Sequence, residues 1–258
     1  MIDLHAPWLL GVDGVPASRD EVLRLAHDAV QDGITAVGMG AQTGGSRRPV
    51  ARDEYFAAFE RARQWLLDEG IDLGLVPSME VRLAKGMAEG YRRGHYVPLG
   101  NTAYLCLELP PNDFPAYTFD EVQGLQDEGC RVLLLHPERN RTVCRHPELM
   151  ARLSAMGVVG VASAGSLMGR FGEEVEARSW YLMDAGWIHT VASDVRGRQP
   201  LVRLSPAREL LCRRYGDREA FRTMLDVPKA ILQDRYVEPR ARDPIGWQRW
   251  RMAPVGLR

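Results

Sequence analysis

Short runs of consecutive hydrophobic residues alternate along this chain with stretches in which hydrophobic residues recur every three or four positions. The runs are typical of strands buried on both faces, and the periodic stretches are typical of amphipathic helices. The pattern predicts a first strand that ends near residue 5 and further strands at 34–39, 73–79, 104–107, 132–135, 158–162 and 188–192. It predicts helices around residues 18–33, 55–66, 118–125, 146–156 and 167–185, and another that begins at Ser205-Pro206.

The alternation of strands and helices predicts an α/β fold with parallel strands and crossover helices. A (β/α) barrel needs about 250 residues, and the chain has 258, so we expect a distorted TIM-like barrel in a single domain. An open doubly wound sheet is the alternative architecture. Two helix starts are marked by a hydroxyl and a carboxylate at capping-box spacing, Ser18 with Glu21 and Thr118 with Glu121.

The composition excludes several classes of protein. With 45% hydrophobic residues the chain can bury a core, which excludes an intrinsically disordered protein. No hydrophobic run approaches the ~20 residues that cross a bilayer, and a net charge of −1 gives no basic surface for nucleic acid. The four cysteines form no CxxC pair and the first residues do not resemble a signal peptide, so we expect a cytoplasmic protein.

Ionisable side chains fall at the ends of the predicted strands. These are His5, Glu80, Glu108, His136 and Asp194. Glu80 and Glu108 are 28 residues apart, Glu108 and His136 are again 28 apart, and Asp194 follows 58 residues later, about two more steps. If each step is one strand–helix unit, these side chains meet at the carboxyl-terminal rim of the barrel, where barrel enzymes carry out their chemistry.

Carboxylates and imidazoles that converge on one rim need a cation between them, because they otherwise repel one another or stay unsatisfied. Divalent ions such as Mn²⁺, Fe²⁺ or Zn²⁺ accept such a mixed set of nitrogen and oxygen donors. For each residue taken alone, a capped or salt-bridged strand end is the favoured interpretation. Five of them at a repeating spacing favour a metal site.

Short motifs surround these strand ends: MIDLH at 1–5, GIT at 33–35, SMEVR at 78–82, YLCLELP at 104–110, LLHPER at 134–139, AGSLMGRFG at 164–172 and ASD at 192–194. In this order they resemble the PHP (polymerase and histidinol phosphatase) superfamily. Within it the chain is most similar to the CpsB-like manganese-dependent protein-tyrosine phosphatases of capsule and exopolysaccharide operons. The likeness covers residues 1–235, which we predict to form the barrel domain, and leaves a tail at 236–258.

The resemblance implies a PHP-type barrel that holds a cluster of three metal ions. The residues that match family ligands are His5, Glu80, Glu108, His136 and Asp194. They make up one set of Glu80, Glu108 and His136 and a partial neighbouring set of His5, Glu80 and Asp194.

Four other family ligand positions are replaced in this chain, by Pro7, Gln42, Gly14 and Arg196, and the ligand role of Asp13 stays open. Proline has no side-chain donor and the Gln42 amide is a weak neutral ligand. Arg196 either repels a cation or binds phosphate oxygens in its place. We therefore expect one or two divalent ions, with manganese as the implied metal, rather than three.

Arginines at the same rim are candidates for binding phosphate. Arg139 resembles a family phosphate-binding arginine, although it could also pair with Glu138 or with a neighbouring strand end. Arg198 lies in a loop that resembles the family's arginine loop. Arg139, Arg196 and Arg198 are therefore the candidate catalytic residues, which would stabilise charge on a phosphoryl group.

The resemblance implies a metal-dependent phosphatase that hydrolyses phosphotyrosine on proteins and is linked to regulation of capsular or exopolysaccharide synthesis. Its partner would be a phosphotyrosine protein, for example a tyrosine kinase of the polysaccharide pathway, and the sequence is compatible with an oligomer. The replaced ligands favour an alternative, a catalytically degenerate barrel that binds a phosphorylated or acidic partner. A small-molecule phosphatase or amidohydrolase of the same superfamily is a third hypothesis, because fold does not fix the substrate.

Overall fold

The computed structural model describes residues 1–8, 18–43, 50–195 and 203–238. In these ranges the strands are β1 (Ile2–Asp3), β2 (Ala36–Met39), β3 (Gln42–Thr43), β4 (Gly74–Pro77), β5 (Glu80–Arg82), β6 (Tyr104–Glu108), β7 (Arg131–Leu135), β8 (Val159–Ser163) and β9 (Ile188–Ala192). Every strand pair is parallel, in two sheets with the orders β1-β2-β4 and β3-β5-β6-β7-β8-β9. The predicted α/β class with parallel strands is confirmed.

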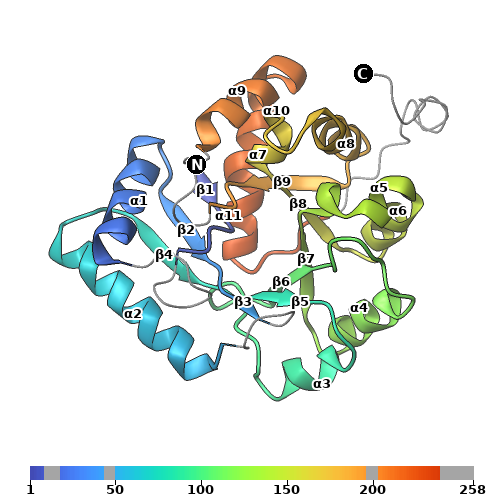
Figure 1. The fold of residues 1–258 in the computed structure, drawn as a ribbon, viewed down its shortest axis with the longest axis horizontal. Helices are drawn as coiled ribbons and strands as arrows, with labels where there is room; N and C mark the ends of the chain where they lie inside the picture. Colours follow the sequence, from blue (N-terminus) through green and yellow to red (C-terminus); the bar gives the residue numbers. More distant parts are fainter. Residues whose placement is uncertain (9–17, 44–49, 196–202, 239–258) are drawn as a thin grey trace.

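Helices surround the strands, as Figure 1 shows. They are α1 (Arg19–Gln31), α2 (Arg52–Asp68), α3 (Met87–Arg92), α4 (Thr118–Asp127), α5 (Arg141–Arg145), α6 (Glu148–Ala155), α7 (Ala164–Leu167), α8 (Glu173–Asp184), α9 (Leu204–Tyr215), α10 (Asp217–Phe221) and α11 (Val227–Leu232). A 3-10 turn, η1 (Pro137–Arg139), follows β7, and a π-helical turn, η2 (Arg222–Asp226), precedes α11. None of the described helices combines the length and hydrophobicity of a membrane span.

The central strands are buried on both faces. Tyr104 and Cys106 of β6 belong to an inner cluster that also contains Val227 and Ile231 of α11, whereas Leu105 between them belongs to the larger cluster that includes the helices. This two-sided burial explains the uninterrupted hydrophobic runs in the sequence. The interior is therefore a packed core that α11 helps to fill.

The two sheets are segments of one circuit of strands. Gly38 of β2 pairs with Val76 of β4, and Gln42 of β3 pairs with Glu80 of β5, so the same pairing offset continues across both interruptions. At the other edge the backbone N–H of Asp194, just after β9, donates to the carbonyl of His5, just after β1 (3.1 Å). The hydrogen-bond ladder is interrupted, but the strands surround one interior and their carboxyl ends meet at one rim.

Of the two capping boxes predicted from the sequence, the structure confirms the cap at Ser18 and not the one at Thr118. Ser18 caps α1, since its Oγ accepts from the backbone N–H of Glu21 (3.3 Å). The capping box at Thr118 is wrong: the Thr118 hydroxyl donates to the carbonyl of Pro115 (2.6 Å). The carboxylate of Glu121 accepts instead from the first N–H groups around α3 (2.9 Å). Tertiary contacts therefore replaced the local cap.

Two further helix predictions need correction. The helix expected at 167–185 begins only at Glu173, as α8, and a separate short helix, α7, ends at Leu167. Gly169 and Gly172, with positive φ angles of 73° and 92°, separate the two. The α9 helix begins at Leu204 without a serine cap. Its first N–H groups are bound instead by Asp32 at the end of α1 (2.6 Å to the Leu204 nitrogen).

The predicted boundary at residue 235 stays a prediction, since residues 239–258 lie outside the described ranges. The last described residues pack back on the strands. Tyr104 donates its hydroxyl to the carbonyl of Arg235 (2.8 Å) and accepts from the N–H of Val237 (3.1 Å).

Candidate metal centre

Two residues of the candidate site have an unusual backbone. His136 follows β7 with φ of 49°, and Asp194 follows β9 with φ of 53°. Non-glycine residues seldom adopt this left-handed conformation, which costs free energy and often marks functional positions. At each of these strand ends the chain turns sharply and directs the side chain toward the rim.

The backbone of His5 is held in place by the carboxylate of Asp3. Its N–H donates to Oδ1 of Asp3 (3.2 Å), and the same oxygen accepts from the N–H of Ser193 (3.1 Å). Burial raises the pKa of Asp3 to about 6, against the opposing hydrogen bonds from Ser193. Asp3 thus joins the end of β1 to the end of β9 and fixes His5 relative to Asp194.

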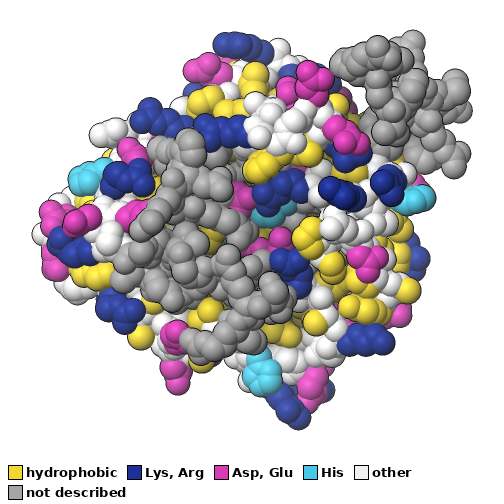
Figure 2. Space-filling model, viewed as in Figure 1, with side chains coloured by type: hydrophobic (Ala, Val, Ile, Leu, Met, Phe, Trp, Pro, Cys, Tyr) yellow, Lys and Arg dark blue, Asp and Glu magenta, His cyan; other side chains and the backbone are white. Residues whose placement is uncertain are grey.

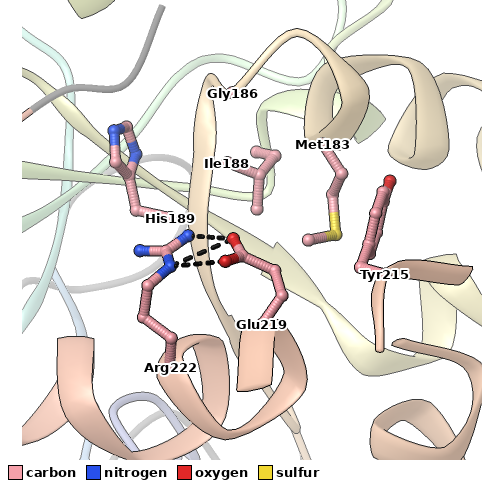
Figure 3. A pocket seen from close by; sticks show the side chains of 7 residues that line it. All are labelled: Met183, Gly186, Ile188, His189, Tyr215, Glu219 and Arg222. Atoms are coloured by element: carbon pink, nitrogen blue, oxygen red, sulfur yellow. Dashed lines mark hydrogen bonds and ion pairs between the residues drawn. The ribbon is translucent and has the colours of Figure 1, made fainter. Parts of the chain in front are cut away.

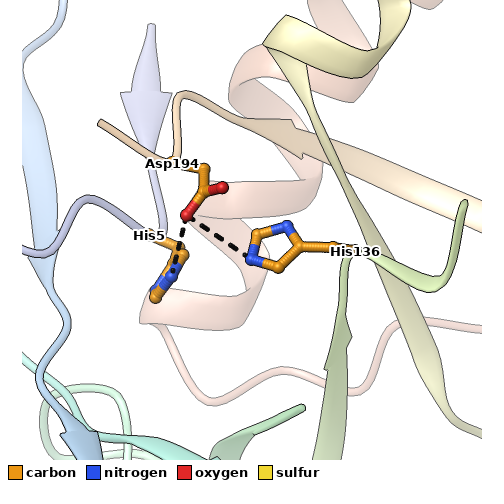
Figure 4. A group of neighbouring side chains, drawn as sticks. All are labelled: His5, His136 and Asp194. Carbon is orange, nitrogen blue, oxygen red and sulfur yellow. Dashed lines mark ion pairs between the residues drawn. The ribbon is translucent and has the colours of Figure 1, made fainter. Parts of the chain in front are cut away.

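Three of the five predicted ligands form a compact group, shown in Figure 4. Oδ1 of Asp194 lies 3.6 Å from Nε2 of His5 and 3.5 Å from Nε2 of His136. The two imidazole rings have centroids 5.5 Å apart. All three residues are buried, with exposed fractions of 0% for His5, 4% for His136 and 9% for Asp194.

These atoms fit a divalent cation. Two donors bound about 2.1 Å from one ion at a tetrahedral angle are roughly 3.5 Å apart, which matches the observed separations of 3.5 and 3.6 Å. Neither ring nitrogen of His136 has a hydrogen-bond partner among the described residues, although both are buried. Burial, followed by the Arg139 guanidinium, holds the pKa of His136 well below its usual value. The ring is therefore neutral, as a ligand must be.

The two glutamates occupy different positions. Glu80 is fully buried, and its Oε2 lies 3.1 Å from Nε2 of His5, next to the three-residue group. Glu108 forms an ion pair with Arg82 of β5 (Oε2 to Nη2, 2.7 Å). The structure therefore places Glu80 beside His5 and pairs Glu108 with Arg82, the last residue of the SMEVR motif, for which the sequence had suggested no role.

Arg139 pairs with a neighbouring strand end and not with Glu138. Its Nη1 lies 2.9 Å from Oδ2 of Asp194, and its guanidinium lies over the ring of Phe171, 5.1 Å from the centroid. Glu138 is fully buried, and its Oε1 accepts from the N–H of Ser163 at the end of β8 (3.0 Å). Glu138 thus anchors the turn after β7, and Arg139 stays at the rim with a quarter of its side chain exposed.

Several candidates from the sequence lie outside the described ranges, namely Asp13, Gly14, Arg196 and Arg198. Pro7 is buried and offers no donor, and Gln42 is described only as part of β3. Near the centre of the face in Figure 2, histidine, acidic and basic side chains lie together.

Gly40 is a further residue that the sequence did not single out. A Cβ atom there would lie 2.7 Å from Cε1 and 2.8 Å from Nδ1 of His5, closer than real contacts allow. Only glycine leaves room for this imidazole. The sequence around Gly40 does not reveal this requirement, because the contact depends on how the segment after β2 packs against the segment after β1.

The pocket in Figure 3 is separate from this centre, because it lies at the start of β9, whereas Asp194 follows its end. It is lined by His189 and the Glu219–Arg222 ion pair, among others. His189 accepts from the N–H of Gly160 at Nδ1 (3.0 Å), so its ring is part of the packing between β8 and β9.

Comparison with known proteins identifies the family of this chain. The family model for capsular polysaccharide synthesis proteins, CpsB/CapC, matches residues 1–233. The chain belongs to the CpsB/CapC family. It is 31% identical to the tyrosine-protein phosphatase YwqE of Bacillus subtilis (strain 168) over 197 residues, which cover 75% of this chain and 76% of YwqE. It is 20% identical to the tyrosine-protein phosphatase CpsB of Streptococcus pneumoniae, over 92% of this chain and all of that protein.

The fold of the family is also that of this chain. A crystal structure from work on YwqE and CpsB, described as unique metal-dependent tyrosine phosphatases, superimposes with a TM-score of 0.90. The match has 24% sequence identity and covers 95% of this chain and 99% of the other. This CpsB/CapC protein also shares its general architecture with an organophosphorus hydrolase from Deinococcus radiodurans, with a TM-score of 0.54 and 13% sequence identity.

Proposed function

We propose that this CpsB/CapC protein is a metal-dependent phosphatase that hydrolyses phosphotyrosine on proteins and acts in the regulation of capsular or exopolysaccharide synthesis. The observation that carries the proposal is the buried group of His5, His136 and Asp194, with separations of 3.5 and 3.6 Å that fit one cation. The names of the relatives YwqE and CpsB support phosphotyrosine as the substrate class.

Four side chains are proposed to hold the cation: His5, His136 and Asp194, with Glu80 beside them. A divalent ion, which we propose to be manganese, supplies Lewis-acid polarisation of the phosphoryl group and activation of water. Glu108 is proposed as a fifth ligand. The proposed site holds one or two ions in all. The ion pair of Glu108 with Arg82 means that ligation requires this carboxylate to exchange a guanidinium for a metal.

Arg139 is proposed to bind the phosphoryl oxygens. Its guanidinium lies against Asp194 at the rim and presents several N–H donors in a planar fork, which suits phosphate. Such donors stabilise the charge that builds up on the phosphoryl group in the transition state. Arg196 and Arg198, in a part of the chain outside the described ranges, are proposed to assist.

Three of the four cysteines are poor candidates for a nucleophile, because their thiols are buried. Burial raises the pKa of Cys106, Cys130 and Cys144 to about 12, and it also raises the pKa of Cys212. At pH 7 only about 10⁻⁵ of a thiol with such a pKa is ionised, and the thiolate is the reactive form. The three buried thiols are therefore poor nucleophiles, which supports the proposal that the chemistry comes from the metal centre.

We expect thiol reagents to leave activity intact. In the native protein a maleimide should modify Cys212 at most, because the other three thiols are buried and protonated. In denaturant all four should react. Mass spectrometry of the labelled protein, with activity measured on the same sample, checks this. Inactivation that tracks the modification of one buried cysteine would contradict it.

Metal removal tests the proposed activity. Treatment with a chelator followed by gel filtration should lower the rate on a phosphotyrosine peptide by about 100-fold or more, and Mn²⁺ should restore it. The same peptide with phosphoserine serves as the substrate control. An unchanged rate without metal would contradict the proposal, and tight binding of the peptide without turnover would favour the catalytically degenerate alternative.

The pathway, the protein partner and the cellular location of the reaction are also proposals. Membership of a family of capsular polysaccharide synthesis proteins supports a substrate in that pathway, and we propose a tyrosine kinase that meets this protein in the cytoplasm. Oligomerisation is also a proposal, which size measurements in solution can test.

A further inference from the structure

An aromatic side chain stands exposed beside the candidate centre. Phe171 lies between α7 and α8, and 47% of it is exposed. Of the described residues, only five large hydrophobic side chains are at least 40% exposed, and Phe171 is the one whose ring lies over Arg139. An exposed aromatic ring at such a place is a surface that a ligand can cover.

The ring of Phe171 is held from two sides. The guanidinium of Arg139 lies 5.1 Å from its centroid. On another side a Cβ atom at Gly165 would be only 3.1 Å from Cε2 of the ring, so the ring lies against glycine backbone. The positive φ angles of Gly169 and Gly172 shape the loop that presents it. Phe171 is therefore placed by contacts, and its remaining surface is open.

Arg139 connects this ring to the metal-ligand group. The same guanidinium lies 2.9 Å from Oδ2 of Asp194, whose other oxygen faces His5 and His136. In an aryl phosphate a single oxygen atom separates phosphorus from the ring. A phosphoryl group bound at the ligand group within reach of Arg139 would hold its aryl ring close to this guanidinium, and Phe171 is the exposed aromatic ring that the guanidinium contacts.

We propose that Phe171 forms an aromatic wall that contacts the phenyl ring of the substrate and favours aryl over alkyl phosphates. This inference rests on the proposed function, since it assigns the substrate class of the same site to one side chain. The ring would pack against the substrate in an offset or edge-on arrangement. A short alkyl phosphate such as phosphoserine has no group that reaches this wall.

Binding of non-hydrolysable ligands tests the wall separately from catalysis. We expect the Mn²⁺-loaded protein to bind phenylphosphonate about tenfold more tightly than methylphosphonate, measured by calorimetry. Phe171→Leu, which keeps a hydrophobic side chain without a ring, should lower the ratio of phenylphosphonate to methylphosphonate affinity to about one, even if loss of the contact with Arg139 weakens both ligands. Phe171→Trp should retain the preference. Phe221→Leu, at a similarly exposed phenylalanine of α10, is the matched control and should behave like wild type.

The outcomes separate the two proposals. An equal phenyl preference in wild type and Phe171→Leu, or no preference in wild type, would overturn the aromatic wall whether or not the protein is an enzyme. A wild-type protein that shows the preference and its loss in Phe171→Leu, but hydrolyses no phosphotyrosine peptide, would support the wall and overturn the proposed phosphatase activity.

Discussion

Replacing His136 with alanine should lower kcat/KM on an aryl phosphate by about 1,000-fold, which corresponds to about 4 kcal/mol of lost transition-state stabilisation. His136 supplies one of the three buried donor atoms that face one point, and its ring has no hydrogen-bond partner among the described residues. The variant should also bind less than its parent's complement of Mn²⁺, measured by elemental analysis after gel filtration.

A surface histidine provides the control for this experiment. His146 precedes α6, and 57% of its side chain is exposed beside Glu148. His146→Ala should retain the activity and metal content of the parent, since its imidazole cannot reach the ligand group. Circular dichroism should show that both variants are folded. Equal activity in the His136 and His146 variants would contradict the assignment of His136.

Replacing Gly40 with alanine should have the second largest effect, although it removes no functional group. The added Cβ would come within 2.8 Å of two ring atoms of His5. The backbone of His5 is fixed by Asp3 and Asp194, so the imidazole itself must rotate. We expect a loss of roughly 10- to 100-fold in Mn²⁺ affinity, as for other changes that misorient a metal ligand, and a parallel loss of activity.

Two other glycines separate this local effect from a loss of folding. A Cβ at Gly124 of α4 would lie 3.3 Å from the Ala88 Cβ of α3, away from the ligand group, so Gly124→Ala requires a small shift between these helices and should leave metal binding unchanged. A Cβ at Gly38 would lie 2.1 Å from the backbone oxygen of Leu4, so Gly38→Ala should unfold the protein or prevent its expression. Gly40→Ala should be folded, with impaired metal binding. A Gly40 variant as active as Gly124→Ala would refute the steric argument.

The strands could be predicted from the sequence because their two-sided burial leaves a local signal. The run at 132–135 predicts β7 since Leu133 faces the inner cluster and Leu134 the outer one. The positions of His136 and Asp194 follow from the same pattern, because each lies just after such a run. Five widely separated residues could therefore be proposed as neighbours from their places at the strand ends and from their spacing.

Other features depend on contacts that no local pattern encodes. The pair of Arg82 with Glu108 and the role of Glu121 as a cap for α3 join segments 26 to 35 residues apart. The left-handed conformation of His136 is not predicted by its residue type, since glycine is the usual choice. Because such contacts are not encoded locally, candidate metal ligands could be predicted from the sequence, but the grouping of His5, His136 and Asp194 could not.

The most direct test is the position of the metal itself. We predict that crystals grown with Mn²⁺ will show an anomalous scattering peak within about 2.3 Å of Nε2 of His5, Nε2 of His136 and a carboxylate oxygen of Asp194. A fully loaded, active protein whose manganese lies elsewhere, with these three side chains free of metal, would contradict the account.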